Sequence, residues 1–163
     1  MPTLLLKNCA ILDVDADGLL GERDVLISDG RIAEIGDTQI KASHDREIDL
    51  RGKVLMPGLC DAHVHAMAYV NNQVTLANTA PYLVAAHASK ILADYLRRGF
   101  TTVRDSGGAD AALADATRLN LFPGPRLFVP GLALAVTGGL GDFRVRTEHD
   151  QGCPHCRSTR NIS

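Results

Sequence analysis

The strongest chemical signal in the sequence is the run Asp-Ala-His-Val-His at residues 61–65. If this run is a β-strand, side chains two residues apart point to the same face, so Asp61, His63 and His65 are predicted to project together. Two neutral imidazoles at this spacing can share one divalent metal ion, each through one ring nitrogen while the other nitrogen donates a hydrogen bond. A bound metal ion lowers the pKa of water and polarises a carbonyl group, so the run points to metal-assisted hydrolysis. Two histidines on one strand face can instead be packed and hydrogen-bonded without any metal.

A pair of cysteines near the end of the sequence offers a second set of metal-binding groups. Cys153 and Cys156 enclose Pro-His in a polar stretch, while Cys9 and Cys60 stand alone. A four-thiolate zinc site needs a second pair, which the sequence does not contain, and a thioredoxin-like motif opens a helix after a strand. All four cysteines are therefore predicted to be reduced thiols. A rival interpretation is a non-catalytic metal-binding or interaction module whose ligands are His63, His65, Cys153 and Cys156.

Composition narrows the class of protein. The 163 residues are 45% hydrophobic and 22% charged, with a net charge of −2, which predicts a folded, soluble chain of roughly one domain. A net charge near zero provides no basic surface for phosphate backbones, so nucleic acid is not expected as a partner. No apolar run reaches the length of a membrane span, and the N-terminus lacks the basic region of a secretory signal. We therefore expect no membrane association and a cytoplasmic location.

The first 57 residues alternate between apolar and polar types, which predicts short strands. Asp29-Gly30 lies between two of them and suits a type I′ hairpin turn, in which both central residues need positive φ. The segment is predicted to be a small antiparallel sheet with one buried face. The predicted strands cover residues 4–12, 24–28, 31–35 and 47–50.

After Pro57-Gly58 the pattern changes to strands that alternate with helices. This order predicts parallel βαβ units, and ligands bind at the carboxyl ends of such strands. Three parallel strands do not complete an α/β domain, since a closed (β/α)₈ barrel takes about 250 residues. Beyond the strand that ends in the histidine run, the predicted elements are helices at 82–98 and 109–119, strands at 100–104 and 126–129, and a long loop at 137–163.

The histidine run belongs to a longer pattern, Pro-Gly-Leu-Cys-Asp-Ala-His-Val-His at residues 57–65. With Ile-Ser-Asp-Gly-Arg-Ile-Ala-Glu-Ile-Gly at residues 27–36, this pattern resembles the amidohydrolase superfamily of metal-dependent hydrolases. Gly-Phe-Thr-Thr-Val-Arg-Asp-Ser-Gly-Gly at residues 99–108, followed by Gly-Pro-Arg at 124–126 and Thr-Gly-Gly at 137–139, is similar to its imidazolonepropionase-like and prolidase-like members. The resemblance covers nearly the whole chain.

The resemblance implies an α/β fold with two parts. Residues 1–57 would form a β-sandwich segment, and residues 58–163 would form the first strands and helices of an incomplete (β/α)₈ barrel. His63 and His65 would be metal ligands, and Arg104 and Asp105 would border the pocket. Asp61 is either a carboxylate that orients a ligand or a structural one, and Arg104 and Asp105 can also form an ion pair that fixes their loop.

The sequence also departs from the family pattern. Members with two metal ions use a bridging carboxylated lysine, two further histidines and a late aspartate as general base, and none of these is present here. Leu140 stands where related sequences often have a histidine. The remaining histidines are interpreted as solvated or packing residues rather than ligands: His44, His87, His149 and His155.

These patterns together predict the N-terminal fragment of an amidohydrolase that cleaves carbon–nitrogen bonds in amides or dipeptides. Its cofactor would be a divalent metal ion, first of all Zn²⁺, with one or two ions in a complete enzyme. No catalytic residue is identifiable within the chain, so the fragment is expected to be inactive alone. A small-molecule substrate is the expected partner, with homo-oligomerisation also open.

Overall fold

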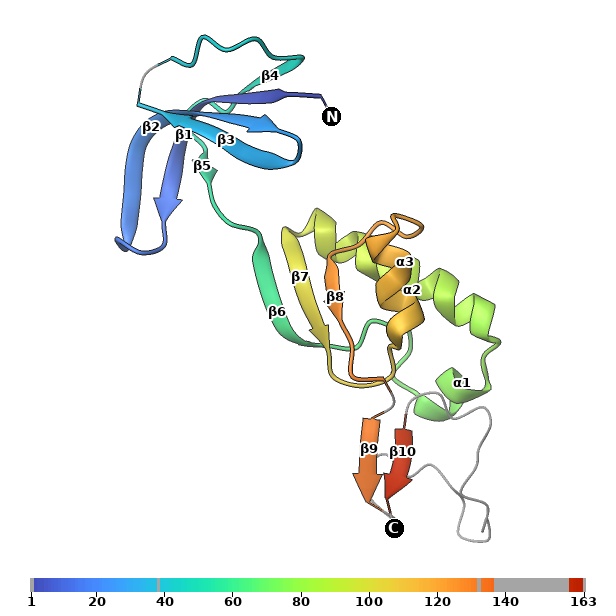
Figure 1. The fold of residues 1–163 in the computed structure, drawn as a ribbon. Helices are drawn as coiled ribbons and strands as arrows, with labels where there is room; N and C mark the ends of the chain where they lie inside the picture. The colour runs from blue at the N-terminus through green and yellow to red at the C-terminus, as the bar shows by residue number, and fades with distance from the viewer. Residues whose placement is uncertain (1, 38, 132, 137–158, 163) are drawn as a thin grey trace, which may run out of the picture. The chain divides into compact units, whose positions relative to one another are not determined.

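The computed structural model describes residues 2–37, 39–131, 133–136 and 159–162 (Figure 1). The chain divides into two compact units, residues 1–57 and 58–163. The longest helix in the described ranges has 17 residues, and no helix there is both long and apolar enough to cross a membrane.

The N-terminal unit is a five-stranded sheet in the order β3-β2-β1-β4, with β5 also paired to β1. The predicted hairpin is present: Asp29 and Gly30 have φ of 52° and 70°, as a type I′ turn requires. The prediction of a purely antiparallel sheet is wrong, because β4 and β5 both run parallel to β1. The strands are β1 (Leu4–Asp13), β2 (Gly18–Ser28), β3 (Arg31–Gly36), β4 (Arg46–Asp49) and β5 (Val54–Leu55).

Apolar clusters lie on both faces of this sheet. Adjacent residues of a strand point to opposite faces, and the neighbours Leu5 and Leu6 of β1 belong to separate buried clusters. Ile40, from the connection between β3 and β4, packs on Leu5. The prediction of a single buried face is therefore wrong, because that connection covers the second face.

The second unit contains the three predicted parallel strands, in the sheet order β6-β7-β8. Helices α2 and α3 pack on one face of this sheet (Figure 1). The core between the two layers joins Val64, Val103 and Leu127 of the strands to Ala88, Leu92 and Leu113 of the helices. The elements are β6 (Leu59–Val64), α1 (Gln73–Asn78), α2 (Pro81–Arg97), β7 (Phe100–Asp105), α3 (Ala111–Arg118) and β8 (Arg126–Phe128).

The two longer helices begin and end at residues that the sequence marks. Pro81 opens α2, where its missing N–H costs nothing, and Gly99 follows the helix with φ of 90°. The side chain of Asp110 caps α3 by accepting a hydrogen bond from Leu113 N. Both predicted helices are confirmed within about two residues at each end, which is the usual uncertainty of helix boundaries.

Three short elements of the second unit were not predicted. Helix α1 has only six residues, and its main sequence signal is the Asn72 cap, whose side chain accepts a hydrogen bond from Thr75 N. Strands β9 (Ala133–Val136) and β10 (Thr159–Ile162) pair in parallel. Strand β10 lies inside the stretch expected to be a loop, so that expectation is wrong there. Residues 137–158 lie outside the described residues.

Candidate metal centre

A bulge in β6 decides which of its side chains come together. Val103 and Asp105 are two positions apart along β7, whereas their partners on β6, Asp61 and Val64, are three positions apart. The extra residue is a β-bulge, and it interrupts the alternation of faces. Val64 is only 3% exposed and lies in the core, while His63 is exposed.

The bulge separates Asp61 from the two histidines, contrary to the prediction that all three project together. Asp61 is paired with the fully buried Val103. Burial, and after it the negative charge of Asp61, raises the pKa of Tyr95 on α2. The Asp61 carboxylate accepts a hydrogen bond from the backbone N–H of His63 at 3.0 Å, a short-range contact that supports the bulge.

His63 and His65 remain together without Asp61. Their ring centroids are 5.4 Å apart, the ring planes are nearly perpendicular at 81°, and both side chains are exposed. Nδ1 of His65 lies 3.4 Å from the carbonyl oxygen of Gly107. This contact is a hydrogen bond in the tautomer that has its proton on Nδ1, and that tautomer leaves Nε2 as a free acceptor.

Asp105 lies at the carboxyl end of β7 and is only 2% exposed. Its Oδ2 accepts a hydrogen bond from Ala66 N at 2.7 Å, just after β6. Its Oδ1 accepts from Gly107 N at 2.8 Å and Ala109 N at 3.2 Å, in the loop after β7. One buried carboxylate thus ties together the two loops that follow neighbouring strands.

The sequence left open an ion pair between Arg104 and Asp105. No such pair is among the interactions of the described residues, and Arg104 has a different partner. Nε of Arg104 donates a hydrogen bond to the carbonyl oxygen of Ala62 at 2.8 Å. The guanidinium group therefore lies against the bulge, next to the residue that precedes His63. Arg104 is exposed, whereas its neighbours Val103 and Asp105 are buried.

The other histidines that the structure describes have local partners. His44 lies within hydrogen-bonding distance of Ala42 O and contacts Glu47, both in its own unit. The ring of His87 stacks on Tyr69 with centroids 4.0 Å apart. Leu140, His149, Cys153, His155 and Cys156 lie outside the described residues.

The two exposed imidazoles fit part of a metal site. Each has a ring nitrogen that is not committed to the protein, and for His65 a carbonyl acceptor opposite the other nitrogen is already in place. Within the described ranges, no His, Cys, Asp or Glu joins them to make a group of three. The pair can therefore supply two ligands, fewer than the three protein ligands of a hydrolytic zinc site.

Sequence patterns did not reveal the backbone groups at this site. The carbonyl oxygens of Gly107 and Ala62 accept from His65 and Arg104, but every residue type has a carbonyl oxygen. The pair Gly107-Gly108 after β7 is the one local signal, because Gly108 has φ of 111°, which other residues rarely adopt.

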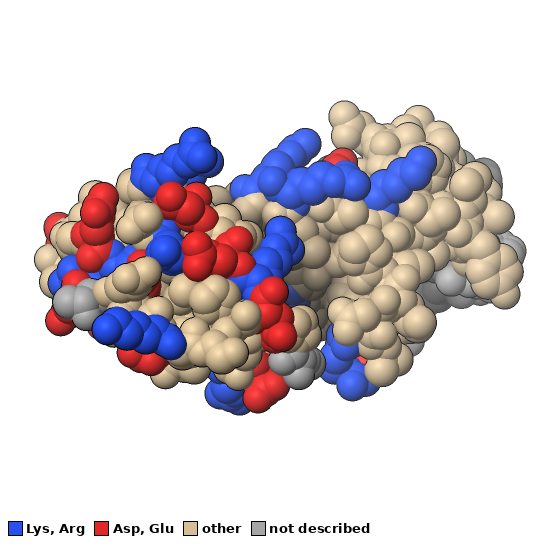
Figure 2. Space-filling view, turned by 90° about the horizontal axis from the view of Figure 1, so that it is seen from above, with Lys and Arg blue, Asp and Glu red and all other residues tan. Residues whose placement is uncertain are grey.

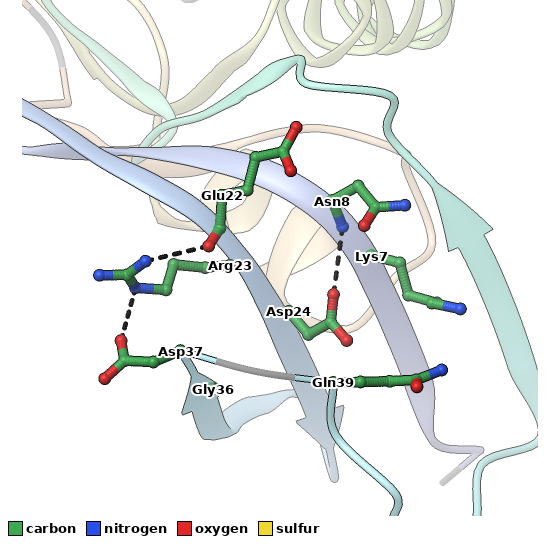
Figure 3. Close-up of a pocket in the computed structure, with 8 residues that line it drawn as sticks. All are labelled: Lys7, Asn8, Glu22, Arg23, Asp24, Gly36, Asp37 and Gln39. Carbon is green, nitrogen blue, oxygen red and sulfur yellow. Dashed lines mark hydrogen bonds and ion pairs between the residues drawn. The ribbon is translucent and has the colours of Figure 1, made fainter.

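A hollow of about 320 Å³ on the N-terminal unit contrasts with the histidine site (Figure 3). Its charged groups have partners within the N-terminal unit: Nε of Arg23 lies 2.7 Å from Asp37, and Lys7 contacts Glu47, which lies outside the lining. The buried Asp24 carboxylate accepts hydrogen bonds from the backbone N–H groups of Asn8 and Ile40. These interactions stabilise the sheet and its covering connection, so the hollow is read as structural.

Comparison with known proteins places the chain in a family. Residues 54–161, about two thirds of the sequence, match the model of the amidohydrolase family. The matched range contains the histidine pair, the bulge and the Asp105 loop. The chain belongs to the amidohydrolase family.

Individual relatives cover parts of this chain. A 5'-deoxyadenosine deaminase of Methanosarcina mazei is 43% identical over 67 residues, which is 40% of this chain and 15% of the relative. The ochratoxinase of Aspergillus niger is 32% identical over 125 residues, 73% of this chain and 26% of the relative. Both are named as enzymes, so the chain has named enzymes among its relatives.

Solved structures show the same fold over nearly the whole chain. A prolidase crystallised with N-methylphosphonate-L-proline superposes with a TM-score of 0.90 and 38% identity, over 99% of this chain and 40% of that one. An amidohydrolase superposes with a TM-score of 0.89 and 42% identity, over 99% and 41%. The chain thus spans well under half the length of these relatives.

Proposed function

We propose that the chain is the N-terminal part of a metal-dependent hydrolase that cleaves carbon–nitrogen bonds in small amides or dipeptides. The observation that carries the proposal is the exposed pair of imidazoles on β6, in a chain that belongs to the amidohydrolase family. The N-terminal sheet would be its β-sandwich segment, and β6 to β8 would be the first strands of its barrel.

His63 and His65 would hold a divalent ion, with Zn²⁺ as the first choice because imidazole is one of its usual ligands. When bound, such an ion lowers the pKa of a water molecule and polarises a carbonyl group. The chain's own contribution is to keep both rings exposed at the end of one strand and to hold Nδ1 of His65 against a carbonyl oxygen.

Arg104 would bind a carboxylate of the substrate. Its Nε donates to Ala62 O, which fixes the guanidinium group beside the histidine strand and leaves the two terminal nitrogens for a ligand. A guanidinium group is suited to carboxylates because it can donate two parallel hydrogen bonds. A dipeptide has such a carboxylate next to its scissile bond, and a prolidase is among the solved structures that resemble this chain.

The chain alone should not turn over substrate. Two imidazoles are too few ligands for a hydrolytic site, and among the described residues no further His, Cys, Asp or Glu joins them. The sheet face opposite α2 and α3 also carries exposed side chains, among them Arg104 and Phe128, that a completed barrel would enclose.

No nucleic acid is proposed as a partner. On the N-terminal unit as drawn in Figure 2, Lys and Arg side chains lie among Asp and Glu side chains and uncharged residues. This mixture supports a small-molecule ligand more than a polyanion.

Zinc titration of the reduced chain tests the proposal. We expect one weakly bound Zn²⁺, measured by competition with a chromogenic chelator. Replacement of His63 or His65 with Gln should weaken binding by more than about tenfold, since loss of a mere outer partner already costs about 10–100-fold. His44→Gln is the matched control, because His44 lies in the other unit and contacts Ala42 and Glu47.

The alternative module is distinguished in the same titration. If replacing Cys153 and Cys156 with Ser removes zinc, the module with ligands His63, His65, Cys153 and Cys156 is favoured and the hydrolase assignment fails. Unchanged weak binding after that replacement favours the histidine pair alone. Metal-dependent turnover of a dipeptide by the 163-residue chain alone would show that its catalytic set is complete.

A further inference from the structure

We propose that Asp105 is a positioning residue for His65, acting through the backbone of Gly107. By holding the Gly107 carbonyl oxygen opposite Nδ1, Asp105 selects the tautomer in which Nδ1 carries the proton and Nε2 would be free to hold a metal ion. The inference rests on the proposed function for its consequence, metal binding, but the tautomer itself is a property of the metal-free chain.

Asp105 contacts Gly107 directly. The buried carboxylate accepts the Gly107 N–H at 2.8 Å, and the carbonyl oxygen of the same residue lies 3.4 Å from Nδ1 of His65. Gly107 therefore links the two side chains, donating to one and accepting from the other. Hydrogen bonds to an ionised acceptor are the stronger kind, so Asp105 holds the Ser106–Gly107 peptide group firmly, and the Gly107 carbonyl oxygen lies on the next peptide group, across the Gly107 Cα.

The loop around Gly107 is hydrogen-bonded at both of its ends. Ser106 N donates to Val64 O at 2.9 Å, which ties the start of the loop to the end of β6. Gly108 N donates to Gly131 O at 3.0 Å, and Gly131 N donates to Ala109 O at 3.1 Å, which fixes its other end to the segment after β8. The Gly107 carbonyl oxygen is thus held between two anchored neighbours.

The Asp105 carboxylate also positions the chain next to His65. Oδ2 of Asp105 accepts the N–H of Ala66, the residue directly after His65, at 2.7 Å. The Asp105 carboxylate therefore holds the backbone on both sides of the Nδ1 contact, at Ala66 next to His65 and at Gly107. A carboxylate is required for this, because it has only acceptors, and Ala66, Gly107 and Ala109 all present donors to it.

A merely structural role for Asp105 makes a different prediction. In that case a variant that weakens the carboxylate would lower stability and leave the His65 tautomer unchanged. A positioning role predicts that the tautomer changes while the chain is still folded.

The experiment uses the metal-free full chain with ¹⁵N-labelled histidine at a pH where imidazoles are neutral. Long-range ¹H–¹⁵N spectra report which ring nitrogen carries the proton, and His65→Gln identifies the His65 signals. The wild-type chain should show His65 with its proton on Nδ1. Asp105→Asn should shift it toward the mixture of an unrestrained imidazole and weaken Zn²⁺ binding by about 10–100-fold.

Asp110→Ala is the matched control, since it removes a nearby carboxylate that caps α3 without contacting the Gly107 loop. It should lower stability and leave the His65 tautomer and zinc affinity unchanged. A folded Asp105→Asn chain with an unchanged tautomer overturns the proposal. If that variant does not fold, the wild-type spectrum still decides, because a proton on Nε2 of His65 overturns the proposal by itself.

Failure of the proposed function has a different signature. If His63→Gln and His65→Gln leave zinc binding unchanged but Asp105→Asn changes the tautomer, the positioning inference stands and the metal site is elsewhere. If both histidine variants lose zinc and Asp105→Asn changes neither tautomer nor affinity, the metal site stands and the positioning inference is overturned.

Discussion

Asp105→Asn should destabilise the second unit by about 2–4 kcal/mol. A carboxamide keeps one acceptor oxygen for Gly107 and Ala109, but because it is uncharged it holds their N–H groups more weakly than Oδ1 of the carboxylate does. Its NH₂ group then faces the Ala66 N–H, so a donor meets a donor where a 2.7 Å hydrogen bond stood. A hydrogen bond to a charged group contributes about 1.5–3 kcal/mol, and an unpaired buried N–H costs about 1–3 kcal/mol. Both figures count part of the same loss, so they are not simply added, and the expected destabilisation is about 2–4 kcal/mol.

Urea unfolding followed by far-ultraviolet circular dichroism measures this loss. With a slope of about 2 kcal/mol/M, the expected change moves the midpoint of the second unit down by about 1–2 M. Asp94→Asn is the control, because Asp94 is exposed and its ion pair with Arg97 spans one helical turn. Such a pair contributes at most about 0.5 kcal/mol. A midpoint for Asp105→Asn as close to wild type as that of the control would refute the account of the three backbone donors.

Three further outcomes follow from the structure. Iodoacetamide should modify Cys60 much faster than Cys9, as mass spectrometry after timed quenching would show, because Cys60 is exposed whereas burial raises the pKa of the Cys9 thiol. Leu92→Ala should lower the free energy of unfolding by about 2–5 kcal/mol in urea melts, since Leu92 is fully buried between helix and sheet; a loss below 1 kcal/mol would contradict that packing. Hydrogen bonding from the Thr3 backbone lowers the pKa of Asp45, so its stabilising contribution is present at neutral pH and is lost as pH falls below about 4; equal acid stability of Asp45→Asn and wild type would argue against it.

Local patterns predicted most of the elements. The helix over residues 82–98 could be read from its periodicity, from Arg97 and Arg98 in the last turn and from Gly99 after it, all of which act within a few residues. The Asp29-Gly30 turn was equally local. Helix α1 has too few residues for a periodic signal, and the pairing of β9 with β10 joins segments more than twenty residues apart.

The candidate site was predicted less completely, for a physical reason. The sequence showed His63 and His65 two residues apart, and the structure brings their rings together. The alternation rule also placed Asp61 with them, because that rule takes no account of a β-bulge. The bulge depends on how β6 aligns with β7, whose residues lie about forty positions further along the chain. The roles of Asp105 and Arg104 depend on backbone partners, which residue types do not encode.

The hydrogen bonds around Asp105 also bear on the order of events during synthesis. Every group that holds the Gly107 carbonyl oxygen, from Val64 to Gly131, lies within one continuous stretch of chain. A nascent chain that has released residue 131 from the ribosome therefore already contains all the groups that orient His65. We expect the proton position on that ring to be set whenever this stretch is folded, without a contribution from any later segment.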